Sequence, residues 1–181
     1  NGIGEKSASS LKKLLGQTRI IDLLYLVPSY WLTRKKISHI REAQPGDWII
    51  TGVQRKKHLP AYGNKTPYKI QVQQEDSLFE IVFFHRQQSW IKSNFPINSQ
   101  KIISGKVSFF HHQPLIIHPD YVVSPEQAKN IPEIEAIYPT TAPLRQKFLQ
   151  KTIQQALKLL PSNFPEWLDR KTVEERGWPT H

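Results

Sequence analysis

The sequence predicts a mainly β fold with helical flanks, and three observations lead to this prediction. Between residues 47 and 123, five consecutive segments have the alternating or β-branched composition of strands. Helical patterns occupy the residues before and after this region, with one short helical pattern inside it. The regular alternation of strands with crossover helices that is typical of parallel sheets does not appear. We therefore expect a β domain between helical segments, and not an α/β fold.

The predicted first domain, residues 1–45, begins with a small helical hairpin. Residues 2–16 read GIGEKSASSLKKLLG, in which two glycines form a tight turn and leucines then recur at helical spacing up to Gly16. Residues 19–28, RIIDLLYLVP, form a second short apolar helix that ends at Pro28. These two helices lead into the β region.

The predicted second domain, residues 46–124, contains the strands. One of them, PYKIQVQQ, alternates strictly, so that Tyr68, Ile70 and Val72 share one face and polar residues share the other. A tight connection at His111–His112 joins the last two strands. The five predicted strands are residues 47–57, 67–74, 78–85, 101–110 and 113–123.

Residues 86–100 separate the third predicted strand from the fourth. Within them, Trp90, Ile91 and Phe95 are expected to form a helical turn that plugs one end of a barrel. Five strands with a helical insert between the third and the fourth have the chain order of an OB-fold. The fold prediction is therefore a five-stranded OB-fold barrel, preceded by the helical hairpin and followed by an amphipathic helix.

The predicted third region, residues 125–181, contains that amphipathic helix. Residues 132–146 are expected to be extended, and residues 162–176 to form a short helix and a connector. Between them, seven apolar residues lie on one stripe of a helix, which predicts packing against a core or another domain. They are Leu144, Phe148, Leu149, Ile153, Ala156, Leu157 and Leu160.

Charge and composition point to a polyanionic partner. The chain of 181 residues has a formal net charge of +10. Residues 1–119 hold 17 basic and 7 acidic residues, whereas residues 120–181 hold 8 of each. The first two-thirds should therefore attract polyanions, the alternative being a merely solubilising surface. The absence of cysteine excludes disulfides and thiolate metal sites and suits a reducing cytosol, and no apolar run is long enough to span a bilayer.

No catalytic or metal site is expected in this chain. The sequence contains no GxxxxGK[ST] phosphate loop and no GxSxG, HExxH or EF-hand motif. The neighbours His111 and His112 and the neighbours Glu75 and Asp76 both lie in predicted turns. They are interpreted as surface residues. No cofactor is expected either.

The strongest candidate for a nucleic-acid contact is a basic segment from Arg34 to Lys69. Nine basic residues lie there, opposed only by Glu42 and Asp47. Lysines on a barrel rim can follow phosphates, and an exposed aromatic residue can stack on an unpaired base. The alternative is a solvated loop. The candidate binding residues of this segment are Arg55, Lys56 and Lys57 at the end of the first strand, Tyr62 and Lys65 in the loop after it, and Lys69 in the second strand.

Two further features are candidates for contact with DNA. Phe83 and Phe84 are consecutive in a strand and therefore point to opposite faces, so one belongs to the core and the other is available to stack on a base. The glycine turn at residues 2–4 precedes a helix and offers backbone N–H groups to a phosphate. For that turn, a purely structural role is the preferred interpretation.

Four blocks of the chain match the sequence patterns of one protein family, and the first block consists of two segments. The segments GIGEKSASSLKKLLG and IIDLLYLVPSYW are similar to the family's GxGxK…L and DLLxxLPxRY patterns. The segment IVFFHRQQSWIKSNF is similar to its FFN strand end, and SGKVSFFHHQPLIIHPDYVV to its GKV…HPEY pattern. The segment AIYPTTAPLRQKFLQKTIQQAL is similar to its VYPxTEGLxxxxLRxxxxxAL block. The family is RecG, the branched-DNA helicases, which the chain resembles in these blocks. They occur in the same order as in the family and span nearly the whole chain.

The resemblance implies a wedge domain, an OB-fold that binds replication forks and Holliday junctions and separates the arms at the branch point. It implies a role in fork regression and in recombination and repair. ATPase domains that use ATP and Mg²⁺ are expected beyond His181, and the chain is expected to pack against them. The resemblance further implies a monomer in the cytoplasm, associated with the nucleoid and not with a membrane.

The resemblance also assigns residues. Phe84 takes the position of the aromatic residue that caps unpaired bases, Phe83 is its neighbour on the other face, and Arg86 joins the candidate DNA-binding residues. His85 stands where the family has asparagine. A second stacking aromatic of some members corresponds here to Gln87 or Gln88, and residues 30–32, Tyr-Trp-Leu, depart from the usual RYEDR.

Two other functions remain open from the residues. An OB-fold that binds RNA would also explain the charge and the barrel, and a preference for forked DNA over structured RNA would exclude it. A module that only docks other domains through its 144–160 helix would show no salt-dependent affinity for DNA.

Overall fold

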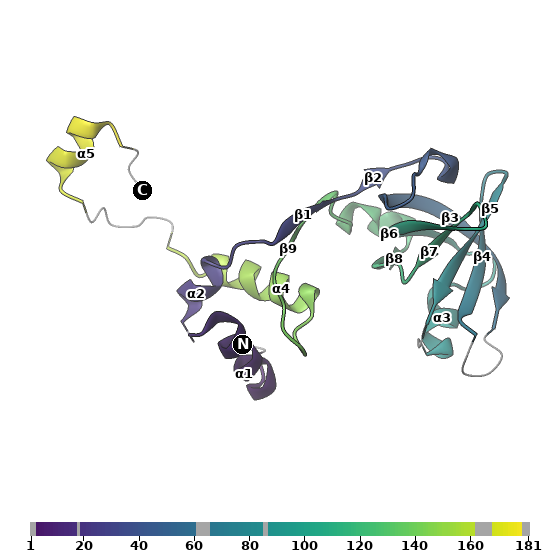
Figure 1. The fold of residues 1–181 in the computed structure, drawn as a ribbon, viewed down its shortest axis with the longest axis horizontal. Coiled ribbons are helices and arrows are strands. Elements are labelled where there is room, and N and C mark those ends of the chain that lie inside the picture. Colours follow the sequence, from purple (N-terminus) through teal and green to yellow (C-terminus); the bar gives the residue numbers. More distant parts are fainter. Residues whose placement is uncertain (1–2, 18, 61–65, 85–86, 162–167, 179–181) are drawn as a thin grey trace. The chain divides into compact units, whose positions relative to one another are not determined.

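The computed structural model describes residues 3–17, 19–60, 66–84, 87–161 and 168–178 (Figure 1). The chain divides into two compact units, a barrel unit of Trp31–Glu135 and a helical unit of Asn1–Tyr30 with Ala136–His181. The barrel unit extends beyond the predicted 46–124 at both ends. The first and third predicted regions thus contribute to one and the same helical unit.

The barrel unit is a closed barrel of five strands, as predicted. The order around it is β3-β4-β5-β7-β6, and a pairing between β3 and β6 closes the ring. Only β5 and β7 pair in parallel within the ring, and the helix α3 (Gln88–Asn94) follows β5 in the chain. This is the strand order of an OB-fold. The strands are β3 (Trp48–Leu59), β4 (Tyr68–Gln74), β5 (Ser77–Phe83), β6 (Gln100–Phe110) and β7 (Gln113–Ile117).

Shorter elements accompany the barrel. A short strand, β2, pairs in parallel with β3, and the strand β8 pairs with β6. The strands β1 and β9 form a separate two-stranded sheet. Two 3₁₀ helices, η1 and η2, precede β3 and follow β8, respectively. These elements are β1 (Tyr30–Thr33), β2 (Lys35–Lys36), η1 (Ile40–Glu42), β8 (Tyr121–Val123), η2 (Pro125–Asn130) and β9 (Ile134–Ile137).

The sequence predicted one continuous fifth strand over residues 113–123. The structure has two strands there, so the prediction of a continuous strand was wrong. The strands β7 and β8 both run antiparallel to β6, but residues 118–120 between them leave the ladder. His118 has a left-handed φ of 48°, and Pro119 has no N–H to donate. Because residues in strands do not adopt this left-handed conformation, the strand is interrupted at this kink.

The core of the barrel follows the predicted alternation. Tyr68, Ile70 and Val72 of β4 are all at most 3% exposed. Ile91 and Phe95, at α3, are fully buried and Trp90 packs against the same core, so the helical plug is confirmed. Burial of these side chains in the core determines which of their neighbours along the strands point to the surface.

Gly105 in β6 allows the kink to lie close to the strand. A Cβ atom placed on Gly105 would lie 2.5 Å from Cγ2 of Ile116 and 3.3 Å from Cα of Pro119. A contact of 2.5 Å between carbon atoms is well inside their optimal separation of about 3.5–4.0 Å. The glycine of the SGKV block is therefore required by packing.

The helical unit has its own core, formed by α1, α2 and α4 and the residues beside them. Leu11, Leu23, Leu149 and Ile153 belong to one buried cluster that also includes Leu144 and Ala156. Leu157, predicted on the buried stripe, is 51% exposed because it is the last residue of α4. The helices are α1 (Glu5–Leu15), α2 (Ile20–Leu24), α4 (Gln146–Leu157) and α5 (Arg170–Arg176). None of the described helices has both the length and the apolar character needed to cross a membrane.

Candidate nucleic-acid interface

Phe83 and Phe84 lie at the end of β5, and the structure separates their roles. Phe83 is 1% exposed and packs edge-to-face against Trp90 and Phe95, with ring centroids 6.1 Å away in both cases. It is part of the core and has no surface to offer a base. Phe84 is 43% exposed and is the aromatic residue of the pair that a ligand can reach.

His118, the first residue of the kink, holds Phe84 in place. The backbone N–H of Phe84 donates to Nε2 of His118 over 3.1 Å, and the two ring centroids are 5.8 Å apart. The N–H of His118 in turn donates to the carbonyl of Val82 over 2.9 Å. Phe84 is therefore positioned by hydrogen bonds on a rigid strand end. Sequence reasoning missed His118, although it is part of the HPDY block.

The basic residues at the end of β3 also divide into buried and exposed side chains. A register shift lies between Arg55 and Lys57, because Arg55 pairs with Val72 and Lys57 already with Gln71. Such a β-bulge places two neighbouring residues against one partner. Lys56 and Lys57 are consequently both exposed.

Arg55 points inward instead. It is 5% exposed, and its Nε donates to the carbonyl of Pro96 over 3.0 Å. Its backbone N–H donates to the carbonyl of Ser99 over 3.0 Å. Arg55 therefore ties β3 to the segment before β6, and its burial argues against direct contact with a phosphate.

Several other cations of the barrel are paired with carboxylates. Lys69, a predicted contact, lies 2.8 Å from Glu80 on the neighbouring strand. Lys35 lies 2.9 Å from Asp47, and the hydrogen bond from Lys35 lowers the pKa of that carboxyl. These ion pairs therefore neutralise part of the positive charge that the sequence predicted for the segment from Arg34 to Lys69.

His58 and Tyr68 join the ends of β3 and β4 beside these lysines. Nε2 of His58 lies 3.0 Å from the carbonyl of Phe95 and donates to it, while Nδ1 accepts from the hydroxyl of Tyr68 over 2.7 Å. Burial lowers the pKa of His58, and the nearby charges of Arg55 and Lys92 lower it further. In the neutral form of this histidine, both ring nitrogens therefore have a hydrogen-bond partner.

Arg34, counted in the basic segment, is an internal anchor. It is 3% exposed and forms ion pairs with Asp120 and Glu135. Its guanidinium also lies 5.2 Å from the ring centroid of Tyr121. Burial alone would lower the pKa of Arg34, but its hydrogen bonds and charge interactions with Asp120 and Glu135 raise it overall. Burial, followed by the charge of Glu135, raises the pKa of Tyr121 to about 12.

Comparison with known proteins places this arrangement in a family. A family model described as "RecG wedge domain" matches residues 1–160. The chain belongs to the RecG wedge domain family. The prediction made from the four sequence blocks is confirmed.

Two relatives illustrate the match. The ATP-dependent DNA helicase RecG of Haemophilus influenzae is 27% identical over 163 residues, which are 88% of this chain and 23% of that protein. A solved structure of RecG bound to a three-way DNA junction superposes with a TM-score of 0.73 at 20% identity, covering 97% of this chain and 24% of that one. The chain thus spans about a quarter of the length of these RecG relatives, and the structural similarity supports the fold.

Three of the predicted contacts of this RecG wedge domain lie outside the described residues. They are Tyr62, Lys65 and Arg86, and His85 lies outside them as well. Among the described residues, the structure therefore leaves Phe84, Lys56 and Lys57 as the predicted contacts that are exposed. Gly4 of the glycine turn is the N-cap of α1, which accounts for it structurally.

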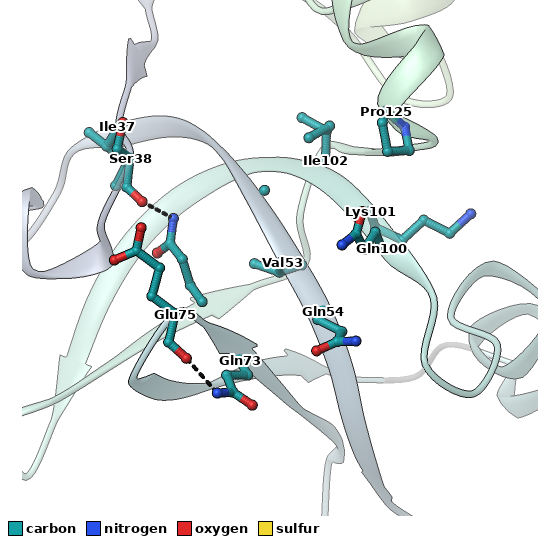
Figure 2. A pocket seen from close by; sticks show the side chains of 12 residues that line it. Ile37, Ser38, Val53, Gln54, Gln73, Glu75, Gln100, Lys101, Ile102 and Pro125 are labelled. Carbon is teal, nitrogen blue, oxygen red and sulfur yellow. Dashed lines mark hydrogen bonds between the residues drawn. The ribbon is translucent and has the colours of Figure 1, made fainter.

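The barrel of this RecG wedge domain also carries an open pocket of about 570 Å³ (Figure 2). Amide side chains from three strands line it, among them Gln54, Gln73 and Gln100. Lys101 and Glu75 contribute the charged groups. The lining offers hydrogen-bond donors and acceptors from these side chains.

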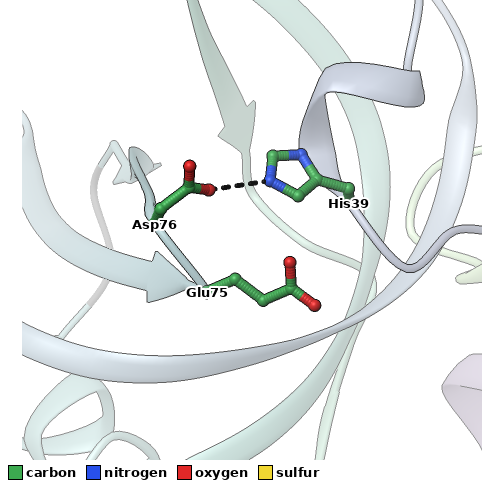
Figure 3. A group of neighbouring side chains, drawn as sticks. All are labelled: His39, Glu75 and Asp76. Atoms are coloured by element: carbon green, nitrogen blue, oxygen red, sulfur yellow. Dashed lines mark hydrogen bonds and ion pairs between the residues drawn. The ribbon is translucent and has the colours of Figure 1, made fainter.

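His39, Glu75 and Asp76 form a cluster whose ligand atoms lie within 4.8 Å of one another (Figure 3). Nε2 of His39 lies 3.1 Å from Asp76, and Nδ1 of His39 accepts from the backbone N–H of Arg41. The guanidinium of Arg41 lies 3.4 Å from the same Asp76. Hydrogen bonds within the protein therefore account for this cluster, and both nitrogens of the histidine are already in use.

Proposed function

We propose that this chain is the wedge of a RecG-like DNA helicase, which recognises replication forks and Holliday junctions and separates their arms at the branch point. This activity would serve fork regression and recombination and repair. The observation that carries the proposal is Phe84, an exposed aromatic residue fixed by His118 at the end of a barrel strand. Membership of the RecG wedge domain family supports it.

The chemistry of the site matches the task. When two strands separate, the last base pair loses the stacking partner on its open side. An aromatic ring in that place restores about 1–3 kcal/mol per base by stacking, with little preference for sequence. Lys56 and Lys57 add attraction to phosphates that is independent of sequence and sensitive to salt. The proposed recognition is therefore of branch shape and not of base sequence.

The remaining parts of the reaction belong to other domains in this proposal. Because the chain corresponds to about a quarter of its RecG relatives, ATP and Mg²⁺ would bind in ATPase domains outside it. Those domains would draw duplex DNA toward the wedge, which would dock on them as part of one monomer. The chain itself supplies the separating residue and no catalytic group.

The test compares binding of the chain to a fluorescent three-way fork and to a linear duplex of matched sequence, with Phe84→Ala alongside. Loss of the stack predicts about a 5- to 100-fold loss of fork affinity and little change for the linear duplex. Phe84→Trp should retain the preference, since any aromatic face can stack.

Leu78→Ala is the matched control, since Leu78 is the second residue of the same strand and is 50% exposed. Equal affinity of the unaltered chain for fork and duplex would refute the wedge function. Tighter binding to a structured RNA than to the fork would favour the RNA-binding alternative.

A further inference from the structure

The sequence predicts that the positive charge lies in the first two-thirds of the chain. In the structure, part of the positive charge lies in the helical unit, which combines residues from both ends of the chain. Three described segments of the helical unit, residues 3–17, 19–30 and 136–161, hold eight basic residues and only two acidic ones, Glu5 and Asp22, whereas its remaining described segment, residues 168–178, holds three of each. All eight basic residues are exposed. They are Lys6, Lys12, Lys13, Arg19, Arg145, Lys147, Lys151 and Lys158.

The lysines of α4 lie on a single stripe. Lys147, Lys151 and Lys158 are separated by four and seven residues, so they share one face of a helix with 3.6 residues per turn. Each lies two residues from a member of the buried set Leu149, Ile153 and Ala156, which places it about 200° around the helix. The lysine stripe therefore points directly away from the core of the unit.

No acidic residue accompanies this stripe. The sequence from residue 136 to residue 161 contains none, and glutamines occupy much of the rest of the polar face of α4. An exposed helix that serves only solubility usually mixes both signs, because opposite charges four residues apart stabilise it. Such a run of one sign favours attraction of a polyanion over mere solvation.

The first lysine of the stripe also opposes the stability of its own helix. The first turn of α4 contains Lys147 and no acidic residue, with Arg145 at the N-cap. Positive charge at a helix N-terminus is unfavourable, because the helix dipole is already positive there. A local rule broken in this way is more often found where function requires it.

We propose that the lysine stripe of α4 binds the phosphate backbone of a duplex arm of branched DNA. The stripe is about 16 Å long, over which one DNA strand carries about five phosphates. The inference rests on the proposed function for the nature of the ligand, and it adds a second contact that grips duplex while Phe84 acts at the branch. An anionic lipid surface fits less well, because the apolar face of α4 is already buried in the core of the unit.

The test replaces the stripe in the full chain by Lys147→Gln, Lys151→Gln and Lys158→Gln together. A control variant loses the same charge elsewhere, through Lys129→Gln, Arg170→Gln and Lys171→Gln, all exposed residues outside the stripe. Binding to a linear duplex and to a matched fork is measured across salt concentrations. Each lost phosphate contact lowers the slope of log affinity against log salt by about 0.9, so the stripe variant should lose about 2–3 in slope on both DNAs.

The outcomes separate this inference from the wedge function. Phe84→Ala should remove the preference for forks and leave the salt slope unchanged, whereas the stripe variant should lower the slope and keep the preference. A lower slope in the stripe variant would support the inference even if Phe84→Ala had no effect. Equal slopes for the stripe and control variants would overturn it, as would absence of DNA binding at low salt. Loss of binding to phosphatidylserine vesicles with unchanged DNA binding would identify a lipid surface instead.

Discussion

At the scale of single residues, neighbours in the sequence have opposite roles. The alternation of a strand predicted that one of Phe83 and Phe84 would be buried, but did not predict which. That choice depends on the side chains of α3 and on His118, which lie outside the strand and pack against Phe83. Arg55 was misplaced among the exposed cations for a similar reason, since its partner Pro96 lies 41 residues away.

A residue-scale prediction concerns pH. Because the pKa of His58 is lowered in the fold, the unfolded chain binds a proton more readily than the folded chain as the pH falls below about 6.5. The contribution of neutral His58 to stability is present above that pH and is lost as the pH falls through the lower folded pKa. Urea unfolding at a series of pH values should show the free energy of unfolding decreasing over this range.

The matching variant is His58→Gln, which has no titrating group. Its free energy of unfolding should fall less steeply with acidification than that of the unaltered chain. Parallel pH profiles for the two proteins would show that His58 is not the group responsible.

At the scale of elements, the sequence predicted the barrel well and its irregularities poorly. The strands, the plug helix α3 and the turn at His111–His112 follow from periodicity and turn chemistry. The bulge at Lys56 and the kink at residues 118–120 were not predicted: the bulge lies in a basic run where no apolar alternation marks the register, and the strand was continued through Pro119 although proline disfavours strand interiors. Each irregularity lies beside a candidate contact, the bulge at Lys56 and the kink beside Phe84.

An element-scale prediction follows from Gly105. A methyl group there has no room between Ile116 and Pro119, so Gly105→Ala should force β6 and the kink apart. Overpacking of this kind costs about 1–3 kcal/mol. Thermal unfolding should show a lower midpoint for Gly105→Ala, and Gly4→Ala, where no atom lies within 4 Å, is the control. A midpoint equal to that of the control would contradict the packing explanation.

At the scale of the whole molecule, sequence order and spatial organisation differ. Composition shifts along the chain predicted three consecutive regions, whereas the structure has two units, one of which combines both ends of the chain. Pairing of distant segments leaves no mark in local composition. For the same reason the charge of the helical unit was not predicted, because its two halves were counted with different parts of the chain.

A prediction at this scale tests the independence of the two cores. Leu149 is fully buried in the cluster of the helical unit, which shares no residue with the barrel cluster. Leu149→Ala should cost about 2–5 kcal/mol, and mainly in that unit. Hydrogen exchange should therefore show faster exchange of amides in α1 and α4, with protection of β3–β6 retained. Uniform loss of protection across both units would show that they unfold as one.

The position of Phe84 directly after β5 has a mechanical consequence. The strand is bonded on both sides, through seven residue pairs to β4 and three to β7. DNA drawn past Phe84 would pull on this strand. A pull along the strand axis loads the hydrogen bonds to β4 and β7 in shear, so that many hydrogen bonds resist it together. A hairpin tip would instead be peeled open one bond at a time. In the proposed function, the closed barrel would thus hold firmly the residue on which a motor would exert its force.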